Sequence, residues 1–79
     1  MLRKKTMKLV ITFHTTADAM AMEELCKKRG IGGRLIPVPR SISAGCGLAF
    51  CAEESALSEL ETAMSEIGLD REGVHHCLI

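Results

Sequence analysis

Two prolines constrain the fold of this chain more than any other feature of its sequence. The run Arg34–Pro39, which reads RLIPVP, has the composition of a β-strand, yet Pro37 and Pro39 stand near its end. Proline has no backbone N–H and cannot donate to a hydrogen-bond ladder, so strands that contain it lie at the edges of sheets. Any strand order predicted for this chain must therefore place residues 34–39 at an edge.

Three other segments have the pattern of strands. In residues 8–15, KLVITFHT, large apolar side chains alternate along the chain, and residues 48–52, LAFCA, alternate in the same way. A period of two predicts a strand that buries one face. Residues 74–79, VHHCLI, predict a short last strand, and residues 40–47, RSISAGCG, predict a loop.

Two segments predict helices. Residues 15–30 begin with Thr15, a favoured N-cap residue, and end with Gly30, which suits the left-handed position after a helix. Residues 55–68 carry apolar residues at helical spacing and end at Gly68 in the same way. The apolar stripe predicted for this second helix consists of Leu57, Leu60, Met64 and Ile67.

The order of these elements, βαββαβ, is that of the ferredoxin-like fold. We therefore predict an α+β protein with a four-stranded antiparallel sheet and two helices on one face. The strand order of this fold, 4-1-3-2, leaves the proline-bearing second strand at an edge. Seventy-nine residues predict a single domain, 1–79, in which the basic residues 1–7 form a flexible N-terminal extension.

Composition narrows the possible partners. The chain has no net charge and only two aromatic residues. Nucleic-acid binding is not expected, because the basic N-terminal cluster lacks aromatic side chains on which bases could stack. We expect no membrane partner, since no apolar run approaches the ~20 residues of a membrane span. The sequence also shows no signal peptide, which predicts a cytoplasmic protein with reduced thiols.

The face of the predicted sheet opposite the helices carries mostly apolar or small side chains. Large exposed apolar faces are unusual on soluble monomers. We therefore expect a homodimer or a higher homo-oligomer that pairs through this face, and a platform covered by a ligand is the alternative. The residues predicted to face outward are Val10, Ile36, Val38, Ala49, Cys51 and Ile79.

The predicted topology brings the loop 40–47 to the end of the sheet where the first helix begins. Cys46 then lies near Thr15, Thr16 and the free N–H groups of the helix start. Such an environment attracts an anion and can lower the pKa of a thiol, and Arg40 adds positive charge. These residues form the candidate site, with Cys46 as the reactive group.

The glycines on either side of Cys46 have two explanations. Gly45 and Gly47 permit unusual backbone angles and let main-chain amides approach an anion. The same residues also suit a tight bend in which Cys46 is merely small. Asp18, in the first turn of the helix, places a carboxylate nearby and works against a low thiol pKa.

The remaining cysteines differ from Cys46 in their predicted surroundings. Cys26 lies on the buried stripe of the first helix. Cys51 follows Cys46 by five residues, roughly 16 Å along an extended strand, so the two cannot share a metal or a disulfide unless the loop folds back. Cys77 lies in the short last strand and is expected to pack there.

The motif His75–His76–Cys77 contains three residue types that can bind a metal ion. Adjacent residues of a strand point to opposite faces, so only His75 and Cys77 could act together, and two ligands do not make a structural zinc site. We therefore expect no metal within one chain and no other cofactor. The role of these three residues stays open.

Several motifs of the chain resemble those of the selenium/sulfur carrier protein-like family. The resemblance lies in ITFHTTADAMAMEELCKKRGI, RLIPVPRSIS and CGLAF, and it spans roughly residues 8 to 68. It implies that Cys46 is the carrier thiol and Arg40 a neighbouring loop residue. The Cys-Pro-x-Pro motif of small sulfurtransferases is absent. The matching positions are Phe13, Thr15, Ala19, Glu23, Arg34–Arg40 and Cys46–Leu48.

The expected function is therefore that of a sulfur or selenium carrier, which presents a reactive thiol on the loop between the second and third strands. Its partners would be donor and acceptor proteins. A carrier or transfer protein fits this sequence better than an enzyme that turns over substrate. The alternative is a non-catalytic module that binds a small anion or regulates, and that oligomerises through its sheet.

Overall fold

The computed structural model describes residues 6–40, 42 and 47–78 of the chain. Its helices and strands follow one another in the order βαββαβ, which confirms the predicted ferredoxin-like α+β fold. The elements are β1 (Met7–Thr12), α1 (Thr16–Arg29), β2 (Arg34–Pro37), β3 (Leu48–Ala52), the 3-10 turn η1 (Glu54–Ala56), α2 (Leu57–Ile67) and β4 (Gly73–Leu78).

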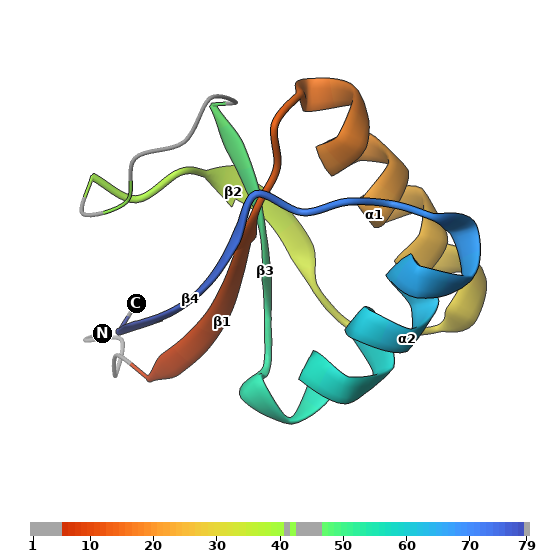
Figure 1. Cartoon of the computed structure of the whole chain (residues 1–79). Coiled ribbons are helices and arrows are strands. Elements are labelled where there is room, and N and C mark those ends of the chain that lie inside the picture. The colour runs from red at the N-terminus through yellow and green to blue at the C-terminus, as the bar shows by residue number, and fades with distance from the viewer. Residues whose placement is uncertain (1–5, 41, 43–46, 79) are drawn as a thin grey trace.

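The four strands form one antiparallel sheet in the order β2-β3-β1-β4. This order confirms the edge position predicted for β2 from its prolines, and the last residue of the strand, Pro37, pairs with Leu48 of β3. Both helices cover the same face of the sheet (Figure 1). In the described part of the chain, no helix is long and apolar enough to cross a lipid bilayer.

The core lies between the sheet and the two helices. Both phenylalanines, Phe13 and Phe50, are fully buried there. Aromatic rings bury more apolar area than other side chains, and the chain has no tyrosine or tryptophan. These two rings are therefore the largest single contributions to the buried apolar area of the core. The other fully buried large side chains of this cluster are Leu9, Ile11, Met22, Leu60 and Met64.

The predicted stripe of α2 is correct except at its last position. Ile67 is 52% exposed, whereas Leu69 packs against the core. The chain reverses at Gly68, which has a φ of 68° in the left-handed region. The N–H of Leu69 then donates to the carbonyl of Met64 at 2.9 Å. This C-terminal motif brings the residue after the glycine back onto the helix, so Leu69 takes the place predicted for Ile67.

The face of the sheet opposite the helices is more covered than predicted. Val10 and Ala49 are fully buried and Cys51 is 8% exposed, so the prediction that they face outward to solvent is wrong. The segment Val38–Arg40 leaves β2 on this side of the sheet, away from the helices (Figure 1). The other residues predicted to face outward are half-buried, Ile36 and Val38, or lie outside the described residues, Ile79.

Candidate functional site

The predicted site lies at the end of the sheet where β1 finishes. Thr12, the last residue of β1, pairs with Ala49 near the start of β3 and with Gly73 at the start of β4. The start of α1 lies at the same end (Figure 1). The topology therefore brings the beginning of β3 and the beginning of α1 together, as predicted. Cys46 and Gly45 lie outside the described residues.

The connection between β2 and β3 carries Arg40 and Gly47. The N–H of Val38 donates to the carbonyl of Gly47 at 3.1 Å, which extends the β2–β3 pairing by one step. Arg40 is exposed in a turn that the N–H of Ile42 closes on the carbonyl of Pro39 at 2.9 Å. Arg40 thus lies just beyond the end of the β2–β3 ladder.

The two threonines predicted near the site lie at the start of α1. Thr15 is the N-cap, as predicted: its side-chain oxygen accepts a hydrogen bond from the N–H of Asp18 at 3.2 Å. One lone pair of the Thr15 oxygen is therefore used by the helix, and its hydroxyl proton can still be donated to another acceptor. Thr16 is the first residue of the helix and is exposed.

The described charges at this end of the sheet are of both signs. The Nδ1 atom of His14 lies 3.8 Å from an Oε atom of Glu72, and the N–H of Glu72 bonds to the carbonyl of Thr12 at 2.7 Å. Asp18 adds a second carboxylate in the first turn of α1. Arg40 and the N–H groups of the helix start are the positive groups of the predicted site, and Asp18 and Glu72 are two carboxylates described at this end of the sheet.

The three described cysteines differ in how far they are buried. Cys26 is 3% exposed within the core, which confirms its predicted packing role, and burial raises the pKa of its thiol. Burial also raises the pKa of the Cys51 thiol, although the nearby charges of Arg34 and Lys8 partly oppose this rise. Cys77 is half-buried in β4.

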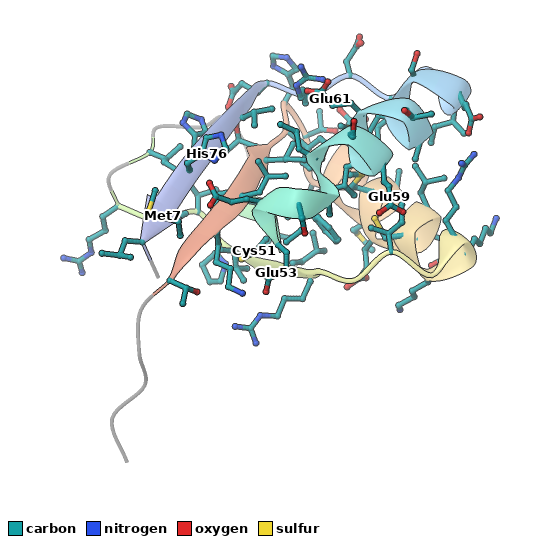
Figure 2. The ribbon with its side chains drawn as sticks, turned by 90° about the horizontal axis from the view of Figure 1, so that it is seen from below. Met7, Cys51, Glu53, Glu59, Glu61 and His76 are labelled. Atoms are coloured by element: carbon teal, nitrogen blue, oxygen red, sulfur yellow. The ribbon has the colours of Figure 1, made fainter. Side chains whose placement is uncertain are left out.

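A hollow that sequence reasoning missed lies at the opposite end of β3. It has a volume of about 590 Å³, and Cys51, Arg34 and Lys8 are among the residues that line it. Arg34 and Cys51 are direct partners in the β2–β3 register, and Lys8 forms an ion pair with Glu53. Figure 2 shows Cys51 and Glu53 beside each other at this end of the molecule. In the sequence, the glycine-rich turn before Arg34 is the feature that could have indicated this hollow.

His76 of β4 contacts a carboxylate of the neighbouring 3-10 turn. The Nδ1 atom of His76 lies 2.6 Å from an Oε atom of Glu54, so this side chain joins β4 to η1. Within the part of the chain that the structure describes, no three His, Cys, Asp or Glu side chains gather closely enough to hold a metal ion.

Comparison with known proteins gives one match. A family model described as "Putative Se/S carrier protein-like" matches residues 8–76, which include every strand and helix of the fold at least in part. No curated protein and no solved structure matches the chain. By this match the chain belongs to the Se/S carrier protein-like family.

Proposed function

We propose that this protein carries sulfur or selenium on the thiol of Cys46. The observation that carries the proposal is the family match over residues 8–76, because it includes the whole β2–β3 connection with Arg40 and Cys46. The fold supports it by placing the start of β3, directly after Cys46 in the chain, at the end of the sheet where α1 begins.

The proposed transfer is a thiol exchange without net oxidation. The thiolate of Cys46 attacks the outer sulfur of a donor persulfide, R–S–SH, and the S–S bond of the donor breaks. Cys46 then holds the outer sulfur as a perthiol, Cys46–S–SH, and the donor leaves as the thiolate R–S⁻. A second exchange passes the outer atom to the thiolate of an acceptor protein and restores Cys46. Selenium follows the same steps when it is the outer atom.

The other cysteines are less suited to this chemistry. The thiolate is the nucleophile, and burial raises the pKa values of both Cys26 and Cys51, so these two thiols stay protonated at neutral pH. Cys77, half-buried in β4, is the natural rival to Cys46 and serves as the matched control.

The partners of a carrier are the proteins that load and unload it. We propose donor and acceptor proteins that dock at the end of the sheet around Arg40, which is exposed. A homo-oligomer also remains a proposal, although Val10, Ala49 and Cys51 are buried within a single chain and cannot supply its contact. Sedimentation of the purified protein measures the number of chains.

The test is sulfur loading by a cysteine desulfurase. The protein is incubated with the desulfurase and cysteine, and its intact mass is measured without reductant. We expect the added mass of one sulfur atom, which disappears on treatment with dithiothreitol. Cys46→Ser should abolish the added mass and Cys77→Ser should preserve it.

Two results would contradict the proposal. Loading that survives in Cys46→Ser would assign the chemistry to another cysteine. Failure of the wild type to load from the desulfurase, and also from a low-molecular-weight persulfide, would favour the alternative of a module that binds without transferring anything.

A further inference from the structure

The hollow at the end of β3 is lined by a different part of the sequence from the one that carries Cys46, the proposed carrier thiol. Cys46 precedes β3, whereas the hollow is lined by the end of that strand, Cys51 and Ala52. The start of β2 and the η1–α2 segment form its other walls. Its volume of about 590 Å³ falls within the range of pockets that hold small molecules, about 300–1,000 Å³.

Among the described residues, the charges that line the hollow include one group of each sign without an ion-pair partner. Lys8 and Glu53 neutralise each other in an ion pair. Arg34, at the start of β2, and Glu59, on α2, also line the hollow and are exposed. Among the described residues, neither of these two side chains has an ion-pair or hydrogen-bond partner. The hollow thus offers a guanidinium and a carboxylate to a ligand.

The glycines before β2 leave the main chain uncovered on one side of the hollow. A Cβ atom on Gly33 would lie 2.4 Å from the Phe50 ring and 2.9 Å from the carbonyl oxygen of Cys51, so no larger residue fits. Space around Gly32 is open, with nothing within 4 Å of the position of a Cβ atom. A ligand can therefore approach the backbone of this segment closely.

We propose that this hollow binds a short zwitterionic peptide, with its carboxylate on Arg34 and its ammonium on Glu59. Arg34 presents a planar fork of N–H donors that matches a carboxylate, and Glu59 accepts from an ammonium. Figure 2 shows Glu59 on the helical side of the same end of the molecule as Cys51 and Glu53. The volume fits a short peptide better than a single amino acid, which would leave most of the space to water.

The test is a titration of the Cys46→Ser protein with trialanine, followed by ¹H–¹⁵N NMR. This variant removes the proposed carrier thiol, so the result is independent of the proposed function. We expect saturable shifts of the amides of residues 32–34 and 51–53. Arg34→Gln and Glu59→Gln should each weaken binding about tenfold, because each removes one charge-assisted hydrogen bond.

The ligand is altered in parallel with the protein. N-acetyl-trialanine lacks the ammonium and should bind about tenfold more weakly, except to Glu59→Gln, where acetylation should change nothing further. Trialanine amide lacks the carboxylate and should behave in the same way toward Arg34→Gln. Glu61→Gln is the matched control, since Glu61 lies on the same helix but pairs with Arg71 and does not line the hollow.

Three outcomes would overturn the proposal. The first is the absence of saturable shifts around the hollow at millimolar trialanine. The second is equal binding of the acetylated or amidated peptide to the unsubstituted hollow. The third is binding of L-alanine as tight as that of trialanine, which would assign the site to a single amino acid. Far-UV circular dichroism checks that the variants fold, as expected for exposed side chains.

Discussion

Gly33 lies at a point where the backbone passes too close to its neighbours for any side chain. It has a φ of 151°, and the ring of Phe50 and the carbonyl of Cys51 occupy the space next to its Cα atom. Phe50 is fully buried and cannot move away without opening the core. The residue is therefore glycine for two reasons, its backbone angle and the close approach of β3.

Gly33→Ala is expected to destabilise the protein by about 3 kcal/mol, from overpacking against Phe50 together with the strained φ. The measurement is the urea midpoint of unfolding followed by circular dichroism. Gly32→Ala is the control, because a Cβ atom there meets nothing within 4 Å, and its effect should stay within about 0.5 kcal/mol. Equal losses in the two variants would contradict this explanation.

Two cysteines show which features of a single residue could be predicted from the sequence: the burial of Cys26 could be, and the neighbours of Cys51 could not. The helical spacing of Cys26 placed it correctly in the core, because a buried stripe on a helix follows from periodicity alone. The surroundings of Cys51 were not predicted, since its neighbours Arg34 and Lys8 come from two other strands. The strand pairing brings these cations to the thiol from positions far away in the sequence, so no pattern around Cys51 itself indicates them.

The helices end where local chemistry predicts. Thr15 caps the start of α1 and Gly30 ends it in the left-handed conformation, with a φ of 69°. Both signals are short-range, so they do not depend on the rest of the fold. Ile67 was predicted wrongly for the opposite reason: the turn after Gly68 decides which of Ile67 and Leu69 reaches the core.

Thr15→Ala is expected to cost about 1 kcal/mol of stability, because the N–H of Asp18 loses its acceptor and the start of α1 frays. Thermal and urea unfolding both measure the loss. Thr62→Ala, an exposed position within α2, is the matched control and should be neutral or slightly stabilising, since alanine favours helices. A cap variant as stable as the wild type would show that water replaces the threonine oxygen without cost.

At the scale of the whole molecule, the strand order could be predicted and the covering of the sheet could not. Pro37 and the sequence of elements were enough to place β2 at an edge. The burial of Val10 and Ala49 could not be foreseen, because alternation assigns a residue to a face of the sheet but does not say how much of that face is exposed to solvent.

Burial of the thiols of Cys26 and Cys51 makes the stability of the whole fold depend on pH in the alkaline range. In the unfolded chain a cysteine thiol ionises near pH ~8.5. Burial raises the pKa values of Cys26 and Cys51 in the folded protein, so the folded state keeps protons that the unfolded state releases. The contribution of these two thiols to the free energy of unfolding should therefore be constant below pH ~8.5 and fall above it, by at most about 1.4 kcal/mol per pH unit for each thiol.

Urea unfolding between neutral pH and pH ~10 with a reductant measures this fall. The double variant Cys26→Ala/Cys51→Ala should be less stable at neutral pH, because it leaves cavities, but its stability should decline less steeply as the pH rises. Ile11→Val, a core variant without a titrating group, should lower the whole curve and keep the wild-type slope. The chain has no tyrosine, so no phenol adds to the loss in this range. Parallel curves for the wild type and the double variant would mean that the two thiols ionise equally in the folded and unfolded chains, and that their burial does not hold their protons.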